Sequence, residues 1–111
     1  KVVFYQKKFR IQNSSMTGQI QYRKGGTVVN IPEGSFVPFE VDPTYNRIGT
    51  VTVGNGGQYE LRLRSEYRYD WNTDKVKFQF VEGGVTYEKI FASLNALHSS
   101  AGPVILEPVT E

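Results

Sequence analysis

The sequence predicts an all-β protein, an antiparallel β-sandwich of seven to nine strands, and two patterns carry this prediction. The first is strict alternation in residues 58–64, where Tyr59, Leu61 and Leu63 are separated by polar or charged residues. A period of two places one face of a strand against a core and the other face in water. The second is spacing, because strand-like runs recur about every 8–12 residues between turn signals, as in a sandwich or a small barrel.

Composition places the chain among globular proteins with a single domain. Its 111 residues are 39% hydrophobic and 22% charged, which is enough for one core over residues 1–111. Cysteine is absent, which excludes disulfides, thiolate metal sites and a cysteine nucleophile. A net charge of +2 is too small to indicate a nucleic-acid partner by itself, and no apolar run is long enough to span a membrane. Because Lys1 opens directly in a strand-like run, we expect a processed or excised fragment.

The first half of the chain contains five expected strands, each bounded by a turn. Their ranges are residues 2–11, which form a mixed extended run, residues 16–23, which alternate cleanly, and residues 27–31, 36–41 and 47–53. The adjacent Gly25 and Gly26 supply the positive φ of a hairpin between the second and third strands. Pro38 removes a hydrogen-bond donor from the fourth strand, so we expect an edge strand or a bulge there.

The second half contains four more expected strands and one short helix. Their ranges are residues 58–64, 75–81, 85–91 and 104–109 for the strands and 92–98 for the helix, with residues 65–74 as the longest central connection. Gly83 and Gly84 mark another hairpin, and connections of this kind predict antiparallel neighbours. We expect the strand with Pro38 and the terminal strand at Val104–Val109 to be exposed edges that are open to β-addition.

The sequence offers no catalytic set and requires no cofactor. His98 is the only histidine, so a Ser-His-Asp arrangement would have to combine it with Ser99 or Ser100, and the G-x-S-x-G motif is missing. The glycines at residues 54–57 precede a strand rather than a helix, so they do not form a phosphate loop. We therefore predict that the protein is not an enzyme and has no catalytic residues.

The central connection holds the candidate ligand contacts. If it is extended, Tyr67, Tyr69 and Trp71 lie on one side, where their rings could stack on sugars or bases. Arg68 or Asp70 would then bind hydroxyl groups. If the rings are buried instead, they close one end of the sandwich, and we favour this second interpretation.

Asp70, Asn72 and Asp74 have a spacing that can wrap a calcium ion with side-chain oxygens. The EF-hand pattern fails, because Lys75 and Val81 stand where that loop needs glycine and glutamate. We favour a polar turn in which these oxygens accept hydrogen bonds from nearby backbone amides, and we predict no metal site.

A basic stripe is a further candidate. Arg62, Arg64, Lys75 and Lys77 would share one polar face if their two strands pair with each other, and such a stripe would attract an anionic partner. We favour a solvated strand face, whose lysines oppose aggregation between sheet edges.

Three blocks between residues 16 and 64 resemble the transthyretin-like, carboxypeptidase-regulatory-like domains. Residues 16–22 are similar to the opening strand of these domains, and residues 37–41, 48–51 and 54–61 are similar to the next block. The C-terminal domain of outer-membrane pilus ushers has a comparable run. The resemblance implies an Ig-like or prealbumin-like sandwich of the non-catalytic kind found in secreted and envelope proteins, and it carries over no functional residue.

Together these features predict a non-enzymatic structural or protein-interaction module in the extracellular space or the cell envelope, with a protein partner. One alternative is a carbohydrate-binding module that stacks Tyr67, Tyr69 and Trp71 on a polysaccharide. Another is an OB-like binder of single-stranded nucleic acid that uses the basic stripe.

Overall fold

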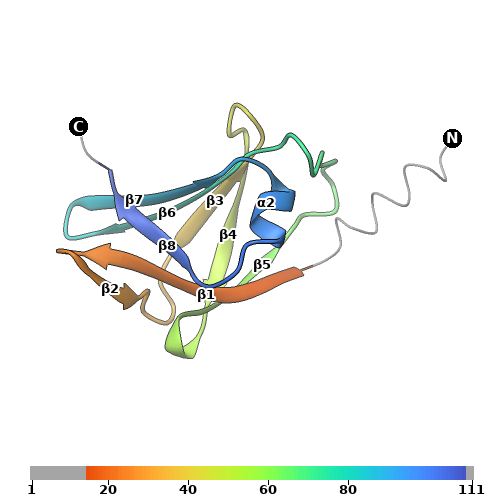
Figure 1. The fold of residues 1–111 in the computed structure, drawn as a ribbon. Helices are drawn as coiled ribbons and strands as arrows, with labels where there is room; N and C mark the ends of the chain where they lie inside the picture. Colours follow the sequence, from red (N-terminus) through yellow and green to blue (C-terminus); the bar gives the residue numbers. More distant parts are fainter. Residues whose placement is uncertain (1–14, 110–111) are drawn as a thin grey trace, which may run out of the picture.

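The computed structural model describes residues 15–109, which form eight β-strands, one 3₁₀ turn and one short helix (Figure 1). The strands are β1 (Ser15–Lys24), β2 (Thr27–Asn30), β3 (Val37–Val41), β4 (Arg47–Val53), β5 (Gln58–Arg62), β6 (Val76–Glu82), β7 (Val85–Phe91) and β8 (Val104–Pro108). The 3₁₀ turn is η1 (Asn55–Gly57) and the helix is α2 (Leu94–His98). The all-β class is confirmed, and these strands agree with the expected ones to within a few residues. The strand expected at residues 2–11 lies outside the described residues.

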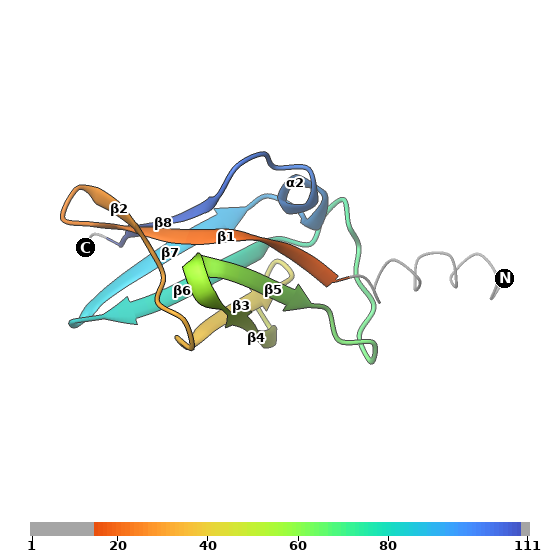
Figure 2. The same cartoon turned by 90° about the horizontal axis from the view of Figure 1, so that it is seen from below.

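Seven of the strands close into a mixed barrel, so the predicted antiparallel sandwich is wrong. The sheet order is β2-β1-β5-β4-β3-β6-β7-β8, and β8 pairs again with β1 to complete the ring. This closing pair is parallel and joins Ile20–Tyr22 to Val104–Leu106. The other pairs are antiparallel. The two perpendicular views show the strands arranged around a single core, with β2 outside the ring (Figures 1 and 2).

Closure also changes which strands are edges. β3 pairs with β4 on one side and β6 on the other, and β8 pairs with β1 and β7, so neither strand is an exposed edge. The expectation of two edge strands is therefore wrong, because a barrel removes most of the free edges that an open sheet would have, although β3 lacks a β6 partner at Val37 and Pro38. Among the described strands, β2 alone has a single partner strand.

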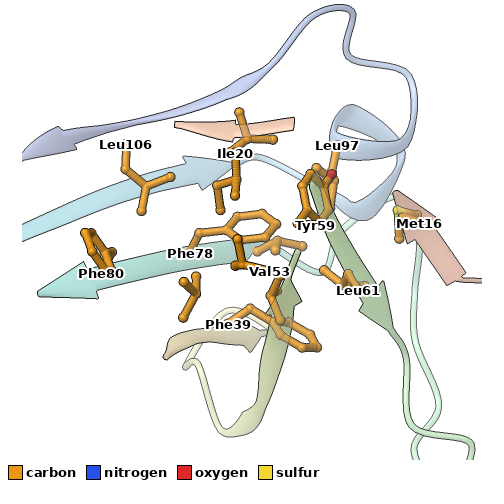
Figure 3. Packing of buried hydrophobic residues seen from close by; sticks show 14 of the residues in the cluster. Met16, Ile20, Phe39, Val53, Tyr59, Leu61, Phe78, Phe80, Leu97 and Leu106 are labelled. Atoms are coloured by element: carbon orange, nitrogen blue, oxygen red, sulfur yellow. The ribbon is translucent and has the colours of Figure 1, made fainter. Parts of the chain in front are cut away.

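The core fills the barrel with alternate side chains of each strand. Its fully buried members include Ile20, Ile31, Leu61, Val76, Phe78, Leu94 and Leu106. Phe78 lies at the centre, with ring centroids 5.9 Å from Tyr59 and 6.5 Å from Phe39 (Figure 3). Burial of a side chain of this size contributes about 1.5–3 kcal/mol, so the alternating pattern alone supplies most of the driving force.

The helix α2 closes one end of this core. The Ser93 side chain caps it by accepting a hydrogen bond from the Ala96 backbone N–H at 3.0 Å. Leu94 and Leu97 are the buried side chains of the helix. No helix within residues 15–109 is long and apolar enough to cross a membrane.

An ionic network fixes the β3–β4 turn and the connection after β5. Arg47 pairs with Asp42 at 3.1 Å and with Asp74 at 2.7 Å, and it also donates to the Arg68 carbonyl. Asp42 has a φ of 96°, which is unfavourable for a residue with a side chain. Its carboxylate accepts hydrogen bonds from the Thr44 backbone and side chain, which hold this conformation.

Candidate functional site

The pairing between β3 and β6 stops early, and this leaves an unpaired length of β6. Only three residue pairs join the two strands, the last being Phe39 with Phe78. The backbone N–H of Asp42 donates to the Lys75 carbonyl, and hydrogen-bonded pairs of an antiparallel ladder recur every two residues. After Glu40, which lies opposite Lys77, the next donor would be Pro38, opposite Gln79. Proline has no N–H to donate, so the ladder ends there. Among the described residues, no strand pairs with β6 beyond Phe78 on this side.

A shallow apolar groove runs along this unpaired edge. Its volume is about 340 Å³, and its lining consists of Ser35, Phe36, Pro38, Gln79, Phe80 and Val81. Phe36 is 70% exposed and Val81 is 58% exposed. Large apolar side chains with this exposure, next to unpaired backbone groups, are typical of a surface that another polypeptide covers.

The exposed apolar side chains continue around the barrel as a row. Val81 lies opposite Thr86 on β7, and the Val109 backbone N–H donates to the Thr86 carbonyl at 2.8 Å. Val109 is 45% exposed. We call Phe36, Val81 and Val109 the apolar row, in which Thr86 of β7 lies between Val81 and Val109.

The floor of the groove is firmly packed. The Phe80 ring lies 5.0 Å from the Tyr22 ring and 6.3 Å from the Tyr87 ring, centroid to centroid. The Tyr22 hydroxyl donates a hydrogen bond to Glu82 at 2.5 Å, and Lys24 lies 3.6 Å from the same carboxylate. Burial of Tyr22, together with its hydrogen bond to the charged Glu82, raises the pKa of this tyrosine to about 12. The floor is therefore preformed, as a binding surface requires.

A second hollow lies at the opposite end of the barrel, where β1 and β8 separate. Its volume is about 290 Å³, and it lies between residues 15–18 of β1, the end of α2 and the segment before β8. Tyr59 forms part of it, and the ring reaches up toward Leu97 of α2 (Figure 3). Gly18 leaves room for this ring, because a side chain there would start 3.0 Å from it. This hollow is partly filled by the helix and its lining is more polar than that of the groove.

The predicted ligand contacts do not form a row of exposed rings. Tyr69 is buried at 6% exposure, and its hydroxyl accepts a hydrogen bond from the Arg64 backbone N–H at 3.3 Å. Tyr67 and Trp71 are partly buried and pack against the core, and Trp71 meets the His98 ring edge-on at 5.7 Å. Arg68 and Asp70 lie between them as exposed residues of an irregular loop. This arrangement adds no support to stacking on a polysaccharide.

Each of the possible calcium ligands has a different hydrogen-bond or ion-pair partner. Asp70 accepts a hydrogen bond from the Asn72 backbone N–H, and Asn72 accepts one from Asn95. Asp74 binds Arg47. Within residues 15–109, no group of three or more His, Cys, Asp or Glu side chains lies together as possible metal ligands.

The basic stripe is not continuous, because β5 and β6 are separated by β4 and β3 in the sheet. Arg62 pairs with Glu60 at 2.9 Å and Arg64 with Glu66 at 2.5 Å. Lys77 lies 3.2 Å from Glu40 and 3.9 Å from Glu88, while Lys75 precedes β6 as an exposed residue. The two strands therefore do not pair, which is the condition that a shared basic face required.

His98 lies on the surface at the end of α2, against Trp71. The hydroxyls of Ser99 and Ser100 donate to the carbonyls of Asn95 and Leu97, at 2.8 and 2.9 Å. These serine side chains satisfy carbonyls at the C-terminal end of the helix, so their hydroxyl protons are directed at backbone oxygens rather than at the imidazole.

Sequence reasoning missed the groove although two signals were present. Phe36 and Val81 fall on the outward-facing side of their runs, where the neighbouring outward positions Pro38, Lys77 and Gln79 are not large and apolar. An apolar residue out of phase with the alternation, next to a proline inside a strand, indicates an exposed and interrupted edge.

Comparison of the chain with protein-family models, with curated proteins and with solved structures returned no match. The resemblance of residues 16–64 to transthyretin-like domains stays a prediction, and only the sandwich fold that it implied is overturned.

Proposed function

We propose that this protein is a non-enzymatic interaction module that captures an extended polypeptide segment at the unpaired edge of β6. The observation that carries the proposal is the interruption of the β3–β6 ladder at Pro38, beside the exposed Phe36 and Val81. Strand addition uses unpaired backbone groups for affinity and side-chain pockets for specificity, and the groove provides both. The extracellular or envelope location remains the expectation from the sequence.

Peptide binding tests the proposal directly. The probes are short labelled peptides in which apolar and polar residues alternate, and the readout is fluorescence anisotropy together with amide exchange of residues 79–82. We expect binding to slow exchange at Gln79 and Val81, whose N–H groups point to the unpaired side of β6, whereas those of Phe80 and Glu82 point to β7 and serve as internal references.

A matched pair of variants locates the site. Val81→Lys places a charge in the groove, whereas Ile48→Lys makes the same change at another exposed position of the outer wall, 53% exposed and opposite Glu40. We expect Val81→Lys to abolish binding and Ile48→Lys to preserve it. Peptides that bind equally to both variants, or that protect residues 15–19 instead, would contradict the proposal.

A further inference from the structure

We infer that the segment captured by the groove is the N-terminal segment of a second copy of this chain, residues 2–11, so that copies associate head to tail. This inference rests on the proposed function and names its partner. Three features support it: the groove, the sequence of residues 1–14 and the direction in which β1 runs.

The segment has the residue pattern of a β-strand. Val2–Gln6 is an uncharged apolar run, long enough to cover the unpaired residues 79–82 of β6. Val3 and Tyr5 alternate with Phe4, so an added strand would place Val3 and Tyr5 on one face and Phe4 on the other, with apolar side chains on both. β-rich, uncharged segments of this length pair readily with an available edge.

Charge favours the same pairing. Residues 1–14 contain four of the 13 lysine and arginine residues and no acidic residue, while residues 15–109 contain nine basic and ten acidic residues. Glu33 and Glu82 lie within two residues of the groove lining, and Glu33 has no ion-pair partner in the described part of the chain. Lys7, Lys8 and Arg10 would follow the inserted run past these carboxylates.

The direction of β1 favours insertion into a different copy. β1 begins with Ser15 at the α2 end and finishes near the groove, where Tyr22 and Lys24 contact Glu82 (Figures 1 and 2). Ten residues of strand span about 33 Å. Folding back along its own barrel would take about ten residues, 5–14, to reach the groove, so Tyr5 and Gln6 would be used on the way and could not pair there. A second copy has no such restriction.

A donor segment at one end and an acceptor groove at the other form a heterologous interface. Such an interface repeats without a two-fold axis, so it builds linear chains or rings rather than a closed two-fold dimer. The number of copies should therefore increase with concentration beyond two.

Two full-length variants test this arrangement by complementation. Val3→Asp combined with Tyr5→Asp disables the donor segment and leaves the groove, whereas Val81→Lys disables the groove and leaves the donor. In sedimentation velocity we expect the unmodified chain to form assemblies larger than dimers, each variant alone to be monomeric, and their mixture to stop at a one-to-one dimer. Ile48→Lys should assemble like the unmodified chain, and circular dichroism should show that all variants are folded.

Binding strength supplies a second readout. A labelled peptide of residues 1–11 should bind the donor-deficient variant at least tenfold more tightly than it binds a chain that also carries Val81→Lys, and added salt should weaken the binding. An unmodified chain that stays monomeric, a dimer that persists in both variants, or a mixture that stays monomeric would overturn the inference. If unrelated alternating peptides still bind the groove while residues 1–11 do not, the inference fails and the proposed function stands. If no peptide binds, both fail.

Discussion

The barrel wall is interrupted in two places, and the described chain covers only one of them. Where β1 and β8 separate, α2 covers the opening and inserts Leu94 and Leu97, which are 0% and 3% exposed. Where β3 and β6 separate, nothing in the described chain covers the edge, and Phe36 and Val81 remain exposed. We call these the covered opening and the open groove.

The contrast shows that lost strand pairing does not by itself create a binding surface. At the covered opening the capped helix α2 packs on the protein's own core, so the contacts there stabilise the fold. At the open groove Phe80 and its aromatic neighbours already close the core formed by residues 15–109, so the outer apolar side chains are not needed to complete that core. Exposed apolar residues above a complete core are therefore the better indication of a partner.

The largest expected effect separates the two openings by stability. Leu94→Ala should lower the free energy of unfolding by about 2–5 kcal/mol, because it leaves a cavity under the helix. Phe36→Ala at the open groove should change it by less than about 0.5 kcal/mol, since that side chain is already in solvent. Urea denaturation of the two variants measures both free energies of unfolding. A comparable loss in the two variants would contradict the distinction between the openings.

Alkaline pH should weaken the end of the barrel beneath the open groove. Because folding raises the pKa of Tyr22 to about 12, the stability from its protonated hydroxyl is intact below pH 10 and is lost as the pH rises through 12. By linkage the loss approaches about 2–3 kcal/mol once Tyr22 is fully ionised. Tyr22→Phe should lack this component. The check is the difference in unfolding free energy between the two proteins from pH 9 to 12, and a difference that stays constant would contradict the assignment.

The loop that supports the covered opening should depend on the Arg47 network. Asp74→Ala removes the acceptor for Arg47 and for the Asp70 backbone N–H, which lie 2.7 and 2.9 Å from its carboxylate. We expect a loss of about 1–2 kcal/mol, because the ion pair is mostly buried and one donor loses its partner. Glu60→Ala, which breaks the solvent-exposed pair with Arg62, serves as the control and should cost less than about 0.5 kcal/mol in the same denaturation experiment.

The smallest change in stability should come from extending the strand pairing at the open groove. Pro38→Thr restores a backbone N–H opposite Gln79, and the added hydrogen bond of about 0.5–1.5 kcal/mol is offset by the lost rigidity of proline. Stability should shift by less than about 1 kcal/mol while peptide affinity falls several-fold, because the edge becomes occupied. Amide exchange at position 38 reports the new bond. Unchanged affinity despite a protected amide would show that peptides bind elsewhere.

Local structure was predictable from the sequence because its causes are local. Gly25-Gly26 and Gly83-Gly84 adopt the positive φ angles that hairpins need, and the alternation around Leu61 and Phe78 places both side chains in the core at 0% exposure. These features depend on a few consecutive residues, so the sequence specified each strand and its buried face.

Closure of the barrel was not predictable from the sequence, because its causes are not local. The pairs β1–β5, β3–β6 and β1–β8 join strands that are distant in the sequence, and no turn residue encodes them. The parallel closing pair is invisible to hairpin signals, because residues 92–103, which include α2, form a long crossover that leads the chain back beside β1. The groove was missed with it, since an unpaired edge has meaning only when the neighbouring strands are known.

The parallel seam between β1 and β8 affects how the molecule is made. β1 can complete the ring only when β8 is available, so the barrel stays open until β8 has left the ribosome. During that interval β1 lacks the strand that it finally meets, and contacts so far apart in sequence form slowly. Nascent chains of this protein should therefore be most vulnerable to misassembly just before β8 emerges.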